Sequence, residues 1–162
     1  MKQRKNQELD QFLFDKKEFK ILISLQNRLS KYIDALNYLY NSKNVKYTLM
    51  VIKASEKSIK ETLSNIRKTD IFLKIPYSKN HYILILQNTE CKSAIQFGSR
   101  LTSLISRTFM LNKKHIDHKV ALIAFETTPP SIMEICYETV HIMKKFNEEN
   151  KDTDYWIEIK RF

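Results

Sequence analysis

Apolar side chains in the first quarter of this 162-residue chain recur every three to four positions. That spacing over residues 7–43 predicts one long amphipathic helix. Its apolar stripe is wider than one contact face needs, so we expect contact with a partner protein or a second copy of the chain. The stripe consists of Phe12, Phe19, Leu22, Leu29, Ile33, Leu36 and Tyr40, widened by Ile21, Ile23, Leu25 and Leu39.

Short runs of β-branched and large apolar residues follow the helix and are typical of strands. They predict five strands, at residues 47–53, 70–76, 82–87, 119–125 and 155–159. The second and third strands flank residues 77–81, which we interpret as a hairpin loop.

Three more helices are predicted between these strands. Capping boxes at Ser58–Glu61 and Ser131–Glu134 indicate two of their starts. The third opens at Asn88-Thr89 and runs to about Met110. From this third helix we expect five side chains to face inwards: Ala94, Phe97, Leu101, Leu104 and Ile105.

The order of these elements is a helix, then β-α-β-β-α-β, then a helix and a strand. The central part is the ferredoxin-like arrangement, an antiparallel sheet with two helices packed on one face. We therefore predict an α/β (α+β) fold, a ferredoxin-like βαββαβ antiparallel sheet with helices packed on it, preceded by a long N-terminal helix. Residues 1–44 are assigned to that helix and residues 45–162 to the α/β domain.

Composition restricts the function classes. Gly98 is the only glycine and lies inside a predicted helix. Phosphate-binding loops need glycine where backbone approaches the ligand, so a P-loop and a Rossmann fingerprint are both excluded. The formal charge is +10, from 28 basic and 18 acidic residues. A basic balance favours anionic partners, but most of these cations are lysines spread evenly along the chain, which is weak evidence for nucleic acid.

The expected location is the cytoplasm. No apolar run approaches the roughly 18 residues that a membrane-spanning helix needs. The basic start of the chain is followed by Asn6-Gln7-Glu8 and not by an apolar signal core. Cys91 and Cys136 are far apart and match no metal or redox spacing, so we expect small buried side chains and no disulfide.

One series of motifs resembles a known family. Ile66-Arg67-Lys68-Thr69-Asp70 precedes strand, hairpin and strand, and Gln87-Asn88-Thr89 then leads into a helix containing Ala94. In this order the chain resembles the diguanylate cyclases, named for their Gly-Gly-Asp/Glu-Glu-Phe (GGDEF) hairpin, over roughly residues 10–160. The family's Arg-x-x-Asp binds cyclic di-GMP as a feedback inhibitor. The resemblance thus implies a ligand-binding role for Arg67 and Asp70.

The catalytic motifs of that family are degenerate here. Its signature hairpin is replaced by Ser78-Lys79-Asn80-His81-Tyr82, and its metal-binding Asp by Ile52, Lys53 or Ser55. The stretch from Lys53 to Arg67 is too short for the family's substrate-contacting Asn and Gly-rich turn. Metal-dependent phosphoryl transfer needs carboxylates on Mg²⁺. We therefore expect a catalytically inactive signalling module that binds no metal and no cofactor.

Two interpretations of Arg67 and Asp70 stay open. Arg offers a bidentate fork to phosphate or a guanine edge, and Asp accepts from guanine N–H groups. Alternatively, Arg67 complements a helix C-terminus and Asp70 accepts backbone donors in the turn.

Other candidate sites have weaker support. A nucleic-acid-binding protein is the alternative function, with Tyr77 and Tyr82 stacking bases beside Lys74 and Lys79. His115-Ile116-Asp117-His118 offers ligands to a transition metal, but a solvated loop explains it equally well. Neither His81 nor His141 has a Ser or Cys partner that the sequence identifies.

Overall fold

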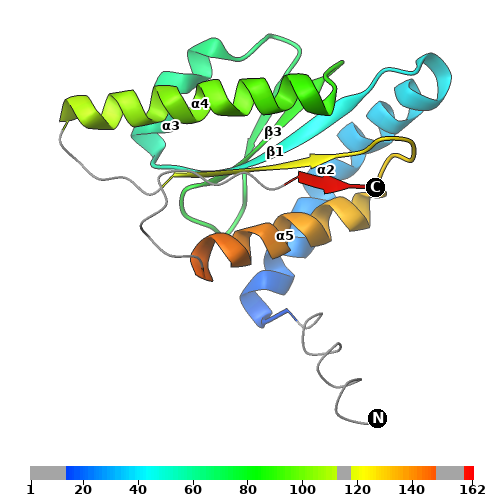
Figure 1. Cartoon of the computed structure of the whole chain (residues 1–162). Coiled ribbons are helices and arrows are strands. Elements are labelled where there is room, and N and C mark those ends of the chain that lie inside the picture. Colours follow the sequence, from blue (N-terminus) through cyan, green and yellow to red (C-terminus); the bar gives the residue numbers. More distant parts are fainter. Residues whose placement is uncertain (1–13, 113–117, 149–158) are drawn as a thin grey trace, which may run out of the picture.

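The computed structural model describes residues 14–112, 118–148 and 159–162, and a five-stranded sheet lies at its centre (Figure 1). The strand order is β2-β3-β1-β4-β5. Neighbours pair antiparallel from β2 to β4, and β5 adds parallel to β4. The strands are β1 Tyr47–Lys53, β2 Ile71–Lys74, β3 His81–Gln87, β4 Lys119–Ala124 and β5 Ile159–Arg161.

Helices cover both faces of the sheet. The helical elements are α2 Lys16–Lys43, α3 Glu56–Thr62, the 3₁₀ turn η1 Leu63–Asn65, α4 Cys91–Asn112 and α5 Ile132–Glu148. α3 and α4 lie together on one face, whereas α2 and α5 pack against each other on the other (Figure 1). The unit from β1 to β4 has the order and connections of a ferredoxin-like sheet, which confirms the predicted fold. The parallel β5 makes the whole sheet mixed.

The central strands are apolar on both faces because both faces are covered. Successive β1 side chains alternate: Leu49 and Val51 lie in the cluster beneath α2 and α5, while Met50 and Ile52 lie in the cluster beneath α4. β3 and β4 alternate in the same way. This explains why the sequence shows continuous apolar runs at these strands instead of a polar–apolar alternation.

The long helix α2 begins one residue after its N-cap. Asp15 accepts a hydrogen bond from the Glu18 N–H at 2.8 Å, and Asn44 ends the helix in a left-handed conformation. Residues 7–13 of the predicted helix lie outside the described residues. The buried face belongs to the same core as the sheet and consists of Ile21, Leu22, Leu25, Leu29, Ile33 and Leu36.

The wide apolar stripe of α2 is only partly covered. Its members Phe19 and Ile23 are exposed in the described part of the chain, and so is Tyr38, which the predicted stripe did not include. Asn44 ends α2, and the assignment of residues 1–44 and 45–162 to separate parts stays a prediction. The use of the stripe for dimerisation stays a prediction.

The single glycine lies in α4, as predicted, and is buried against the sheet. A Cβ on Gly98 would lie 3.4 Å from the Cε of Met50. Val120 Cγ1 would lie 3.9 Å from the same Cβ. Both are ordinary van der Waals distances, so an alanine fits here, and only a residue larger than alanine would press on the side chains of β1 and β4.

Two sequence predictions at helix starts and faces are wrong. The capping residue of α3 is Ser55 and not Ser58, because Ser55 has the extended backbone of an N-cap and accepts from the Ser58 N–H. Ser58 itself is buried in the first turn. Leu104 is exposed instead of facing inwards, and the Ile105 side chain lies outside the described residues.

The cysteines are free, and Cys136 is buried in the α2/α5 core. Burial raises the pKa of the Cys136 thiol to about 12, so it stays protonated and acts as a small apolar side chain. Cys91 is half-buried at the start of α4. Among the helices that the structure describes, none is long and apolar enough to cross a lipid bilayer.

Candidate functional site

The turn between η1 and β2 brings Arg67 and Asp70 together, as the Arg-x-x-Asp spacing predicts. The Asp70 N–H donates to the Arg67 carbonyl at 3.0 Å, which closes the turn. In return the Arg67 N–H donates to Asp70 Oδ2 at 3.1 Å. Asp70 therefore accepts a backbone donor in the turn, as the structural interpretation of this residue expects.

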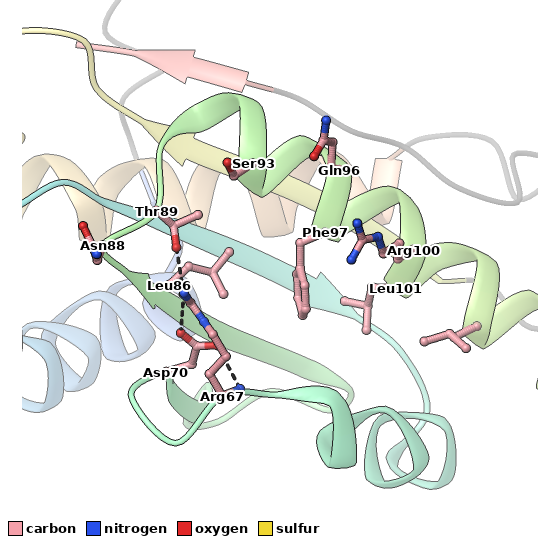
Figure 2. A pocket seen from close by; sticks show the side chains of 11 residues that line it. Arg67, Asp70, Leu86, Asn88, Thr89, Ser93, Gln96, Phe97, Arg100 and Leu101 are labelled. Atoms are coloured by element: carbon pink, nitrogen blue, oxygen red, sulfur yellow. Dashed lines mark hydrogen bonds and ion pairs between the residues drawn. The ribbon is translucent and has the colours of Figure 1, made fainter.

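The Arg67 guanidinium also clamps the Asp70 carboxylate. Nε donates to Oδ2 at 3.2 Å and Nη2 to Oδ1 at 2.9 Å. Nη2 also donates to the Gln87 carbonyl at 2.9 Å. It donates to Thr89 Oγ1 at 2.7 Å as well (Figure 2). These bonds fix the plane of the guanidinium across the β3–α4 connection.

The two partners of this ion pair differ in exposure. The Asp70 side chain is 1% exposed and the Arg67 side chain 52%. Nη1 of Arg67 has no acceptor among the described residues, whereas Nε and Nη2 are both engaged. The pair thus holds a preoriented cation with one end available to a ligand.

Arg67 and Asp70 line a pocket of about 520 Å³. The pocket lies between their turn, the end of β3 and one side of α4 (Figure 2). Its polar residues are Asn88, Thr89, Ser93, Gln96 and Arg100, and its apolar residues are Leu86, Phe97, Leu101 and Leu104. The volume falls in the range of about 300–1,000 Å³ that small-molecule sites occupy.

The chemistry of this pocket suits an anion that carries a flat apolar group. Arg67 and Arg100 supply two permanent cations. Phe97 projects from α4 into the space beside Arg67 and offers a ring face for stacking (Figure 2). Asn88, Ser93 and Gln96 add hydrogen-bonding groups that suit base edges or ribose hydroxyls.

Arg100 is the charged pocket residue that the sequence did not single out, and the α4 residues Ser93 and Gln96 were not singled out either. Arg100 lies one helical turn beyond Gln96 and three residues beyond Phe97, so all three share one side of α4. That spacing is visible in the sequence. That this side of α4 faces the Arg67 turn is seen only in the three-dimensional structure.

Residues 78–82, which the resemblance aligns with the family's signature hairpin, lie at the opposite end of the strands from the Arg67 pocket. Tyr82 is buried and stacks on Phe72, with ring centroids 5.3 Å apart. Lys79 and Asn80 are exposed, and Asn80 has a positive φ of 63°, which Asn tolerates without a glycine. His81 is buried, and Ser78 is half-buried beside it.

The residues that the resemblance aligns with the family's catalytic positions do not fit a magnesium ion. Lys53 ends β1 and pairs with His81 on β3. No Asp or Glu occurs among Ile52, Lys53, Ser55 and the five hairpin residues 78–82. Mg²⁺ is bound through carboxylates in proteins, and a lysine at this position repels it. Within the described ranges, no cluster of three or more His, Cys, Asp or Glu residues forms a metal site.

His81 does have a serine neighbour that the sequence did not identify. Ser78 Oγ lies 2.5 Å from His81 Nδ1, and the Lys79 carbonyl lies 2.8 Å from the same nitrogen. A carbonyl only accepts, so Nδ1 carries the hydrogen and has no lone pair for the serine proton. This pair is not arranged as a nucleophile and its base.

The other candidate residues lie apart from the Arg67 pocket. Tyr82 is buried and so is not available to stack a base, while Tyr77 is 63% exposed. His141 stacks on Tyr137 with ring centroids 6.2 Å apart. Of the His115–His118 motif only His118 is described, and it is buried; residues 115–117 lie outside the described residues.

Comparison with known proteins gives no relative: no family model, no curated protein and no solved structure matches the chain.

Proposed function

We propose that this chain is a catalytically inactive binding module that holds a guanine nucleotide, cyclic di-GMP first among them, in the Arg67 pocket. Arg67 contacts a phosphate through Nη1, and Arg100 contacts it from α4. Asp70 positions Arg67, because its own carboxylate is already occupied by the guanidinium. Phe97 stacks on the base.

The observation that carries this proposal is the preoriented Arg67 in a pocket of small-molecule size. An arginine whose guanidinium plane is already fixed loses little conformational entropy when it binds phosphate. Arg100 makes the pocket selective for anions. Asp70 is the one carboxylate among the described lining residues, and it is already paired with Arg67. The choice of a guanine nucleotide as the ligand comes from the resemblance to the diguanylate cyclases.

Calorimetric titration of the full chain with cyclic di-GMP tests the proposal. We expect one saturable binding event, with a rise in melting temperature that grows with ligand concentration because the ligand binds only the folded state. GTP and GMP are the comparison ligands. If none of the three produces heat or changes the melting temperature, the Arg67–Asp70 pair is structural and the proposal is wrong.

Incubation with GTP should give no cyclic dinucleotide. The candidates for the family's metal-binding position are Ile52, Lys53 and Ser55, and Lys79 and Asn80 replace its signature glycines or acid. None of these residues is a carboxylate that could hold Mg²⁺ or Mn²⁺ to offset charge building on the phosphate oxygens. Chromatography of the reaction, with an active diguanylate cyclase run in parallel, measures this. Cyclic dinucleotide in molar excess over the protein would contradict the prediction.

In the proposed function, the protein interacts with a partner through the exposed part of α2. Phe19, Ile23 and Tyr38 leave apolar surface on this helix after its core face is buried. We propose that a protein partner or a second copy of the chain covers it. Light scattering of the wild type beside the Phe19→Ser/Ile23→Ser variant distinguishes the two: a homodimer dissociates in the variant, and a monomeric wild type excludes self-association.

A further inference from the structure

A second cleft lies on the opposite face of the sheet from the Arg67 pocket. It has a volume of about 1,100 Å³ and is bounded by the start of α2, the end of α5 and the β2–β3 loop. Its apolar floor includes Ile21, Ile75 and Met143, which belong to the α2/α5 core. Leu86 and Leu101 of the Arg67 pocket belong to the other core cluster.

The charges in this cleft are unevenly distributed. Its basic residues are Lys17, Arg28, Lys53, Lys74, Lys79 and Lys144, and its acidic residues are Asp15, Glu18 and Glu148. The hydrogen bond from the Glu18 N–H lowers the pKa of Asp15, and the charge of Lys144 adds to this, whereas burial raises the pKa of Glu18 against the opposing charge of Lys144. The three acidic residues therefore offset the basic residues at the end of the cleft formed by α2 and α5. The end formed by the β2–β3 loop keeps the excess positive charge.

His81 lies at this positive end and is buried, with 5% of its surface exposed. Its Nδ1–H donates to the Lys79 carbonyl at 2.8 Å, and its Nε2 is buried with no hydrogen-bond partner among the described residues. Burial lowers the pKa of His81 to about 4, and the charges of Lys53 and Lys17 act in the same direction. The imidazole is thus neutral at pH 7, and Nε2 is an unsatisfied acceptor.

A buried acceptor near the charges of Lys53 and Lys17 suits a ligand that is both an anion and a donor. An unpartnered buried polar atom is costly, so a native structure that keeps one commonly uses it. A phosphate that carries one proton meets both requirements, because its O–H donates to Nε2 while its other oxygens accept from lysines. Sulfate has the same shape but carries no proton at neutral pH. Tyr77 stands exposed at the rim, with Lys20 Nζ 5.8 Å from the centroid of its ring, so one ring face at most is offered to a nucleoside.

We propose that this cleft binds a phosphorylated small molecule, with one phosphate between His81, Lys53 and the loop lysines Lys74 and Lys79. The source of the phosphate is either an inorganic polyphosphate or a nucleoside polyphosphate. The site is independent of the Arg67 pocket, since the two clefts lie on opposite faces and at opposite ends of the strands.

The affinity test compares two double variants that remove the same charge. Lys74→Ala/Lys79→Ala removes two exposed lysines of the cleft, and Lys57→Ala/Lys92→Ala removes two exposed lysines outside it. By calorimetry with tripolyphosphate and with ATP, we expect about tenfold weaker binding for the first pair and at most about a twofold change for the second. ATP binding far tighter than tripolyphosphate identifies a nucleotide site, and equal binding identifies an inorganic one.

The role of His81 is tested by comparing phosphate with sulfate. In ¹⁵N NMR spectra the Nε2 resonance should shift on addition of inorganic phosphate and not of sulfate. His81→Asn keeps a donor near the Lys79 carbonyl and removes Nε2, so the preference for phosphate should disappear. Cyclic di-GMP should compete with neither phosphate nor sulfate, because it is proposed to bind in the Arg67 pocket. If cyclic di-GMP does not bind the protein at all, the phosphate test of this cleft still stands.

Three outcomes would overturn the proposal. One is equal weakening by the two lysine pairs, and another is an Nε2 resonance that no phosphate compound shifts. The third is a single-stranded oligonucleotide that binds more tightly than tripolyphosphate with a steep salt dependence, because such a ligand is held by many phosphates along a surface.

Discussion

Replacing Ile33 with alanine should lower the free energy of unfolding by about 2–5 kcal/mol. Ile33 is fully buried on α2, within the cluster that also contains Leu49 and Val51 of β1. The substitution removes buried methyl and methylene groups, and the surrounding side chains relax only partly into the space. The loss is large because α2 shares the core of the sheet.

The matched control is the same substitution ten residues earlier on the same helix. Ile23 is 41% exposed, so Ile23→Ala should cost less than about 1 kcal/mol. Urea unfolding of both variants measures this, with the midpoint moving and the slope unchanged. The measurement is repeated at several protein concentrations, because a dimer held by α2 would also be sensitive to Ile23. Equal effects of the two variants would mean that α2 is not part of the folded core.

The sequence predicts the elements of this fold well because local pattern and tertiary burial agree in most of them. β1 lies at the predicted residues, 47–53, because its run of β-branched and apolar residues shows no helical spacing that would favour a helix instead. α3 is different. Ser55 and Ser58 are both good capping residues, and only the extended backbone of Ser55 decides between them. The parallel position of β5 depends on which edge of the sheet is open, which no local pattern encodes.

The two clefts differ in how visible they are in the sequence. Arg67 and Asp70 are three residues apart, so a local motif identifies them and the structure joins them by direct hydrogen bonds. The α4 residues that line the same pocket, including Arg100, are brought there by the placement of the helix. The second cleft is built from ordinary lysines on separate elements. Even the buried His81 has no sequence signal, because it stands at the start of a strand in a loop of polar residues.

Replacing Arg67 with alanine should weaken cyclic di-GMP binding at least tenfold. A charged hydrogen bond contributes about 1.5–3 kcal/mol, and about 1.4 kcal/mol corresponds to a tenfold change in affinity. Arg67→Lys should recover little, because a point charge on a flexible stem neither holds the Asp70 carboxylate at two oxygens nor keeps a fixed direction towards the ligand.

Arg67→Ala also leaves the buried Asp70 carboxylate without its guanidinium, so a folding defect must be separated from lost binding. Arg100→Ala does so, because Arg100 is exposed and lines the pocket while the Arg67–Asp70 pair stays intact. This variant should keep the melting temperature of the wild type and bind the dinucleotide several-fold more weakly. Arg161→Ala is the control: it removes an exposed arginine that pairs with Glu126, away from the pocket, and should change neither quantity. Cyclic di-GMP binding that survives unchanged in both Arg67→Ala and Arg100→Ala would place the ligand elsewhere on the protein.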